Sequence, residues 1–104
     1  MLIQQGDVLI KKIKKLPNNL TKKKADHRGF VLADGEVTGH YHAIKKQDGC
    51  ELYEKDGTLY LSVSDQVVVE HQEHNDVIID PGDYQIGIVK EYDHFAEEAR
   101  AVID

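Results

Sequence analysis

The sequence has 104 residues, of which 40% are hydrophobic and 31% are charged, and its formal net charge is −6 at pH 7. This composition excludes a disordered chain, and the length predicts a single globular domain spanning residues 1–104. No apolar run approaches the length that a membrane-spanning helix needs. A chain of this size buries only a modest core, so we expect a homo-oligomer in which a second copy covers part of the apolar surface.

The single cysteine and the N-terminal segment predict the compartment. Cys50 alone cannot form an intrachain disulfide, which fits a reducing environment. The segment after Met1 becomes polar at Gln4 and Gln5, unlike a secretory signal. We therefore expect a cytoplasmic protein that does not contact membranes. Cys50 follows a glycine in a predicted turn, and we interpret it as a partly buried small side chain rather than a nucleophile.

Charge is distributed unevenly along the chain. Residues 1–46 contain ten Lys/Arg and four Asp/Glu, a balance of +6, whereas residues 47–104 contain three and fifteen, a balance of −12. Seven lysines lie between Lys11 and Lys24. We interpret them as solvated strand edges and loop that oppose aggregation. The alternative is a basic arm that attracts a phosphate-bearing ligand or nucleic acid. The near absence of arginine, the residue best suited to bidentate phosphate recognition, argues against this alternative, and nucleic acid is not an expected partner.

Turn residues divide the first half of the chain into short apolar segments. Gly6-Asp7 opens the first predicted strand, which Pro17 ends, and the polar residues 18–28 predict a loop. A turn at Asp34-Gly35 closes the second strand, and Gly39 interrupts the third. The predicted strands of this half cover residues 8–16, 29–33 and 36–44.

The second half contains the clearest local signal, Asp56-Gly57 between two apolar segments, which predicts a type I′ hairpin. A turn at residues 47–49 precedes it, and residues 80–83 place Pro81 and Gly82 in the favoured positions of a type II turn. The predicted strands of this half cover residues 52–55, 58–63, 67–69, 77–79 and 84–92.

Seven or eight short strands at close spacing predict an all-β barrel or sandwich rather than βαβ units. Residues 96–100 are the only helical candidate and predict at most a short C-terminal helical turn.

Four histidines in two short windows are the best candidates for a functional site. His40 and His42 are two residues apart, so on a strand both rings face the same side. His71 and His74 are three apart and converge only if residues 70–75 turn at the end of a strand, which their polar composition favours. We predict that the two pairs meet at one site, and we interpret the remaining histidines, His27 and His94, as surface residues.

Imidazole is the commonest side-chain ligand of transition metals, so the cluster predicts a site for Zn, Fe, Ni or Mn. Glu36 and Glu73 lie close enough in sequence to act as a base beside such a metal. The plainer interpretation is that the histidines hydrogen-bond one another or a bound anion.

The His-x-His strand at residues 40–42, followed by further strands and a Pro-Gly turn, resembles the first motif of the cupins, small metal-binding β-barrels. Gly35, His40 and His42 match that motif loosely. Lys46 and Gln47 stand where a cupin has its glutamate, and Pro81-Gly82 follows rather than precedes the second pair of histidines. The resemblance implies a cupin-like barrel and a metal-binding role for His40 and His42.

A closer resemblance, to a small bacterial and phage family of uncharacterised proteins, runs almost end to end. It supports one complete domain and implies no activity. The matching segments are residues 5–9, 32–42 with the pattern GEVTGHxH, 71–74 with the pattern HxEH, 81–84 and 91–93.

The sequence thus predicts a small β-barrel protein with a four-histidine metal site, which would suit a metal-dependent enzyme acting on a small molecule. The alternative is a non-catalytic, oligomeric binding module for a small anionic, nucleotide-like ligand or a partner protein. In a third version the metal is purely structural and joins the strand at residues 40–44 to the turn at 70–75. The residues alone leave these three readings open.

Overall fold

The computed structural model describes residues 1–35 and 39–89, so the expected helical turn at 96–100 lies outside the described residues. Regular structure in those two ranges consists of strands, which confirms the all-β prediction. The strands are β1 (Leu2–Gln5), β2 (Val8–Ile13), β3 (Thr21–Lys22), β4 (Phe30–Asp34), β5 (Tyr41–Ile44), β6 (Cys50–Lys55), β7 (Thr58–Val63), β8 (Val67–Val69), β9 (Val77–Ile79) and β10 (Gly82–Ile88).

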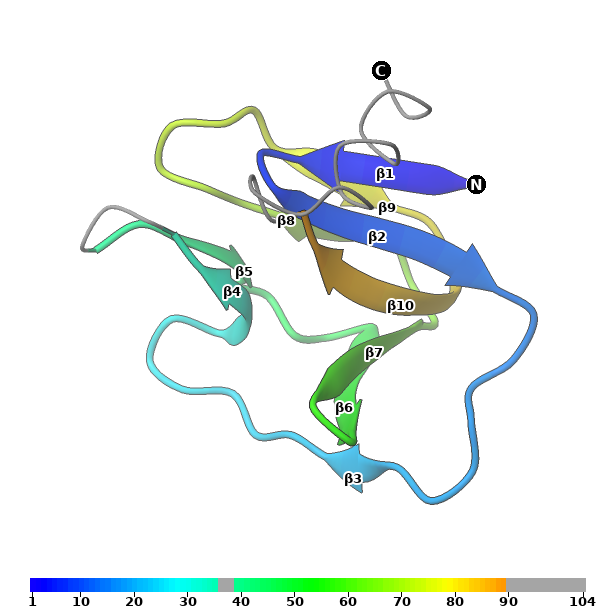
Figure 1. Cartoon of the computed structure of the whole chain (residues 1–104). Coiled ribbons are helices and arrows are strands. Elements are labelled where there is room, and N and C mark those ends of the chain that lie inside the picture. The colour runs from blue at the N-terminus through cyan, green and yellow to red at the C-terminus, as the bar shows by residue number, and fades with distance from the viewer. Residues whose placement is uncertain (36–38, 90–104) are drawn as a thin grey trace.

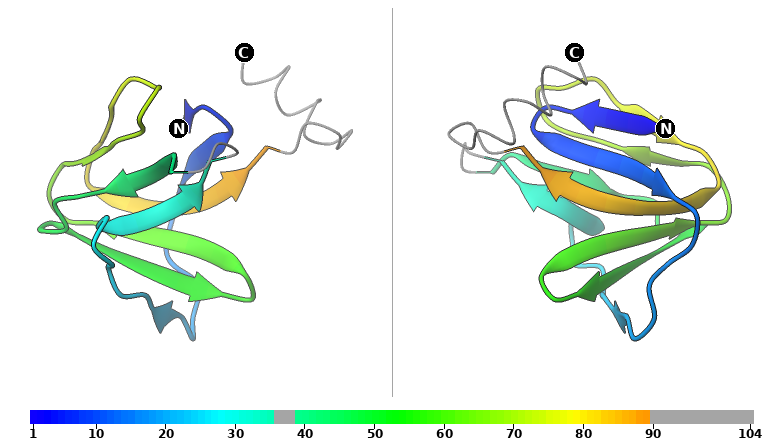
Figure 2. Two further views of the ribbon diagram at one scale, coloured as in Figure 1. Left: turned by 90° about the vertical axis from the view of Figure 1, so that its left-hand side faces the viewer. Right: turned by 45° about the vertical axis from the view of Figure 1, so that its right-hand side comes forward.

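The strands form one large sheet and two smaller ribbons. The large sheet is antiparallel, with six strands in the order β1-β2-β10-β7-β6-β3. It curves around one side of the molecule, and the ribbons β4-β5 and β8-β9 lie across from it (Figures 1 and 2). A bridge between Ala43 and Glu70 joins β5 to the end of β8. The two ribbons therefore act as a second layer, and the core lies between the layers.

The alternation of inward-facing and outward-facing side chains along the strands explains which residues form the core. Val8 and Ile10 of β2 and Tyr84 of β10 are fully buried, whereas Lys11, which lies on the opposite face of β2 from Val8 and Ile10, is exposed. The Tyr84 hydroxyl donates a hydrogen bond to the carbonyl of Asp80 at 2.7 Å, so its polar end is satisfied. The other buried core side chains are those of Phe30, Leu32, Ile44, Cys50, Leu52, Leu61, Val63, Val67, Val69, Ile79 and Ile86.

Two hairpin turns contain residues with positive φ. Asp56 and Gly57 both have positive φ, 50° and 81°, as the predicted type I′ turn between β6 and β7 requires. The second such hairpin, β1-β2, was not predicted: Gly6 has a φ of 57° in a two-residue turn that pairs Gln5 with Val8. Glycine at the first central position is the pattern of a type II′ turn.

Several strand limits differ from those predicted. The strand predicted over residues 8–16 ends at Ile13, because Ile13 pairs with Asp83 near the start of β10 and the sheet offers no partner beyond it. Residues 39–40 are outside β5, and residues 36–38 of that predicted strand lie outside the described residues. The last strand begins at Gly82 instead of Tyr84. Gly82 pairs with Val63 of β7, so the strand begins within residues 80–83, which were predicted as a turn.

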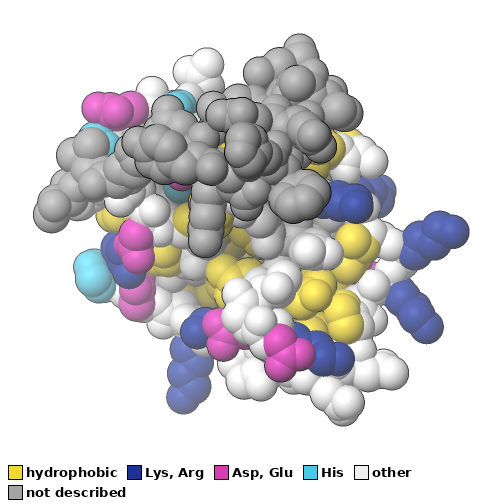
Figure 3. Space-filling view, viewed as in Figure 1, with side chains coloured by type: hydrophobic (Ala, Val, Ile, Leu, Met, Phe, Trp, Pro, Cys, Tyr) yellow, Lys and Arg dark blue, Asp and Glu magenta, His cyan; other side chains and the backbone are white. Residues whose placement is uncertain are grey.

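On the face shown in Figure 3, Lys and Arg side chains project around a centre in which hydrophobic side chains are visible. Large hydrophobic side chains exposed to solvent include Leu2, Val68, Ile78 and Ile88. Among the described residues, no helix is long and apolar enough to span a membrane.

Cys50 provides a test of the packing. Its side chain is buried in the core, and burial, with a smaller contribution from the charge of Glu51, raises the pKa of the thiol to about 11. Because the thiolate is the nucleophile, the folded protein should react slowly with iodoacetamide at mildly alkaline pH, and the protein unfolded in guanidinium should react rapidly. The stability that this neutral thiol contributes is complete below the reference pKa of 9.0 and is lost as the pH rises towards 11. Equal labelling rates for the two states would contradict this packing.

Candidate functional site

The structure brings the rings of His40, His42, His71 and His74 together. The ring centroids of His42 and His71 are 4.4 Å apart, and those of His71 and His74 are 4.6 Å apart. His40 lies 5.6 Å from His71, edge to face, and His42 lies 6.1 Å from His74 with nearly parallel rings. We call these four residues the histidine cluster. The predicted meeting of the two pairs is therefore present in the fold.

Backbone pairing explains why these segments, about thirty residues apart in sequence, converge. Ala43 and Glu70 exchange two backbone hydrogen bonds of 3.0 and 2.9 Å, which hold β5 against the residues that follow β8. The side-chain oxygen of Gln72 accepts a third hydrogen bond, from the backbone N–H of Tyr41 at 2.8 Å. The segment then turns: Nδ1 of His71 accepts hydrogen bonds from the backbone N–H groups of Glu73 and His74, at 3.0 and 3.4 Å.

A buried glutamine joins three parts of the chain beneath the cluster. Gln5, the last residue of β1, is only 3% exposed. Its side-chain amide donates to the carbonyls of Val69 and Asn75, at 3.0 and 2.9 Å. These carbonyls lie at the two ends of the segment that holds His71 and His74. The Gln5 carbonyl oxygen lies 2.7 Å from Nδ1 of His42, so all the polar atoms of the amide are used.

These contacts determine the orientation of the amide and, through it, the tautomer of His42. Turning the amide over would place its oxygen against two carbonyl oxygens, so the nitrogen must face Val69 and Asn75. The oxygen therefore faces His42, whose Nδ1 must carry the proton in the neutral ring. His42 is 1% exposed, and its Nε2 lone pair faces Oδ1 of Asp7 at 3.5 Å.

Burial is the main reason why the pKa of His42 lies below its usual value. The positive forms of His71 and His74 lower it further, and the Asp7 carboxylate opposes the shift. Desolvation, followed by the charges of His74 and His40, also lowers the pKa of His71. Both shifts favour neutral imidazoles, which are the form that binds a metal.

The remaining candidates lie at the outer side of the cluster. The Glu73 side chain is 68% exposed, and its Oε2 lies 3.9 Å from Nδ1 of His40, whose side chain is 23% exposed. Glu73 can therefore orient His40 or accept a proton there. Glu36, the other predicted base, lies outside the described residues. His74 is exposed, so the cluster extends from a buried ring at His42 to solvent.

Gly6 sets the distance between the β1-β2 turn and the cluster. A Cβ atom at this position would lie 2.6 Å from Nε2 of His74 and 3.3 Å from Cε1 of His42. The first distance is shorter than real Cβ contacts allow. The absence of a side chain at Gly6 is therefore what lets the His74 ring rest on the turn.

The rings converge, but not all of their free nitrogens do. Within residues 1–35 and 39–89, no three His, Cys, Asp or Glu side chains are arranged as a group that could hold a metal ion. His71 gives one reason: because its Nδ1 accepts backbone hydrogen bonds, its neutral ring carries the proton on Nε2. His71 could bind a metal only after its ring rotates away from this turn.

The sequence analysis missed Gln5, Gly6 and Asp7 as residues of this site. One signal was available, since Gly-Asp between two possible strands indicates a two-residue hairpin. We interpreted Gly6-Asp7 instead as the start of a single strand. A buried glutamine carries no such signal, since its partners Val69 and Asn75 are 64 and 70 residues away.

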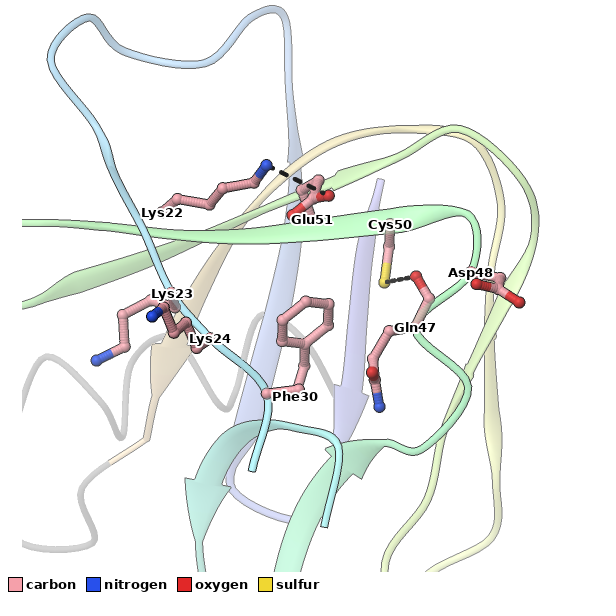
Figure 4. A pocket seen from close by; sticks show the side chains of 9 residues that line it. Lys22, Lys23, Lys24, Phe30, Gln47, Asp48, Cys50 and Glu51 are labelled. Carbon is pink, nitrogen blue, oxygen red and sulfur yellow. Dashed lines mark hydrogen bonds and ion pairs between the residues drawn. The ribbon is translucent and has the colours of Figure 1, made fainter. Parts of the chain in front are cut away.

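A separate pocket of about 450 Å³ lies beside the basic loop. In Figure 4 the side chains of Lys22, Lys23 and Lys24 lie on one side of the Phe30 ring, and those of Cys50, Gln47 and Asp48 lie on the other. Lys22 is paired with Glu51 at 3.6 Å. The pocket therefore combines three lysines with two carboxylates and contains no residue of the histidine cluster.

Comparison with known proteins gives a family without an assigned activity. No curated protein and no solved structure matches the chain. A family model described as a domain of unknown function, DUF8820, matches residues 4–88, which include the histidine cluster and the β1-β2 turn. The chain therefore belongs to the DUF8820 family.

Proposed function

We propose that this protein binds one divalent transition metal at the histidine cluster, through His40, His42, His71 and His74. The observation that supports this most directly is the buried Nε2 lone pair of His42, which faces the Asp7 carboxylate at 3.5 Å with no proton between them in the neutral ring. Two acceptors in this position repel each other, and a cation between them removes the repulsion. Zinc, iron, nickel and manganese all suit imidazole ligands.

Binding requires movements of the His71 and His74 rings. His74 lies at the surface and can turn about its side-chain torsions, whereas the half-buried His71 must first give up the two backbone hydrogen bonds that its Nδ1 accepts. His42 stays fixed by Gln5. The fixed position of His42 matches the general pattern in which a metal-binding histidine donates the N–H group of its other ring nitrogen to a fixed acceptor.

A purely structural role for the metal is the weaker alternative. Two backbone hydrogen bonds between Ala43 and Glu70, and one from Tyr41 to Gln72, already join the two segments that such a metal would connect. The exposed outer side of the cluster favours an exchangeable position for water or a small molecule. A metal with such a position can act as a Lewis acid, and Glu73 is the described carboxylate that could serve as a base there.

The second candidate function is binding of a small anion, and the observation that favours it is the pocket beside Lys22, Lys23 and Lys24. Two carboxylates in the same pocket, one of them paired with Lys22, reduce its attraction for an anion. Salt and chelator distinguish the two functions in solution. An anion held by lysines is released at high salt and is unaffected by a chelator, whereas the metal stays bound at high salt and is removed by a chelator.

The first prediction concerns metal affinity. Calorimetric titration of untagged protein with Zn²⁺ should show one equivalent bound, and His74→Ala should weaken binding by about tenfold or more, because it removes an exposed ligand at little cost to the core. His27→Ala is the matched control, since His27 is exposed and lies outside the cluster. Equal weakening by the two substitutions, or absence of binding to the parent protein, would contradict the proposal.

The second prediction concerns metal removal. The protein treated with EDTA should keep its circular dichroism spectrum and a cooperative thermal transition, because protein hydrogen bonds hold the two segments together. Added Zn²⁺ should raise the melting temperature, since a ligand at 100 times its Kd stabilises the folded state by about 2.7 kcal/mol. Unfolding in EDTA would instead assign the metal a structural role.

The third prediction uses two turn glycines with positive φ. Gly6→Ala and Gly57→Ala both introduce backbone strain, since φ is 57° and 81° respectively. A Cβ at Gly57 meets no atom within 4 Å, whereas a Cβ at Gly6 displaces His74. Both variants should lose stability in urea, and only Gly6→Ala should weaken Zn²⁺ binding. Equal affinities would show that the position of His74 does not matter to the site.

A further inference from the structure

The β1-β2 turn places a carboxylate beside the most buried ring of the cluster. Asp7 is the second residue of this turn, its side chain is 40% exposed, and its Oδ1 faces Nε2 of His42. The backbone holds it there, because the Asp7 carbonyl accepts a hydrogen bond from the N–H of Val89 at 2.8 Å. Asp7 therefore reaches from the surface towards the interior side of the cluster.

Gln5 determines whether the His42 ring presents a lone pair or an N–H group to Asp7. With its amide nitrogen committed to Val69 and Asn75, Gln5 offers only its oxygen to His42, which keeps the His42 proton on Nδ1. The opposite tautomer would place an N–H group on the side of Asp7 and leave no lone pair there for a metal. The buried amide thus selects the tautomer that a metal ligand needs, before any metal is present.

We infer that Asp7 is an oxygen ligand of the metal beside Nε2 of His42, and that Gln5 is the positioning residue that makes this possible. The inference rests on the proposed metal site and extends it from four histidines to a mixed nitrogen and oxygen site. Imidazole with a carboxylate favours Zn²⁺, Fe²⁺ and Mn²⁺ over the softer Cu⁺. Asp7 also brings a negative charge that partly neutralises the metal.

Two measurements test the two halves of this inference separately. The first is the tautomer of His42 in the metal-free wild-type protein, read at mildly alkaline pH from ¹H–¹⁵N correlations of the histidine rings. His42 should show a protonated Nδ1 and an unprotonated Nε2. A proton on Nε2 would overturn the inference, whether or not the protein binds a metal.

The second measurement is Zn²⁺ affinity of Asp7→Asn, with Asp56→Asn as the matched control. Asp56 is exposed in the β6-β7 turn at a φ of 50°, which asparagine tolerates, and it belongs neither to the histidine cluster nor to the β1-β2 turn. Asp7→Asn should weaken Zn²⁺ binding by about tenfold or more, and Asp56→Asn should leave it unchanged. Circular dichroism confirms that both variants are folded.

The outcomes separate this inference from the function on which it rests. If Zn²⁺ binds the wild type and His74→Ala weakens it, but Asp7→Asn does not, the metal site stands and Asp7 is not a ligand. If the wild type binds no metal, the proposed function and the ligand role of Asp7 both fail. The tautomer measurement then still decides whether Gln5 positions His42.

Discussion

The amide of Gln5 is the interaction on which the rest of the site depends. It is buried, it satisfies two backbone carbonyls and one imidazole, and it connects β1, β5 and the segment between β8 and β9. Removing the amide would leave the buried carbonyl of Val69 without this partner, at about 1–3 kcal/mol, and would also release the part-buried carbonyl of Asn75. This amide could serve the core alone, but its oxygen is directed at His42, the most enclosed ring of the histidine cluster. Stability and ligand geometry therefore depend on the same side chain.

The histidine cluster combines a fixed interior with an adjustable exterior. His42 is held by Gln5 and surrounded by the core, whereas His74 lies at the surface on the backbone of Gly6. Backbone hydrogen bonds between Ala43 and Glu70 already join the two segments that a structural metal would otherwise connect. Under the proposed function, a metal held by this cluster keeps outer positions that can exchange, which is the arrangement that binding or chemistry on a small molecule requires.

Local patterns allowed much of the fold to be predicted, and the site only in part. The Asp56-Gly57 hairpin follows from two residues whose preference for positive φ is intrinsic, and the turn at 71–74 follows from its polar composition. The functional roles of Gln5 and Asp7 could not be predicted in this way. Their partners come from strands distant in sequence, and only the sheet order brings β1 beside the cluster. The metal, the oligomeric state and the cupin-like character inferred from His40 and His42 stay predictions.

The most direct test of the account is the position of a bound metal. Crystals soaked in Zn²⁺ and measured at the zinc absorption edge should give one strong anomalous peak about 2.0–2.1 Å from Nε2 of His42, with an Asp7 oxygen at a similar distance. The rings of His71 and His74 should have turned towards the peak while Gln5 keeps its three hydrogen bonds. A peak only at other surface residues, or none at the histidine cluster, would contradict the account.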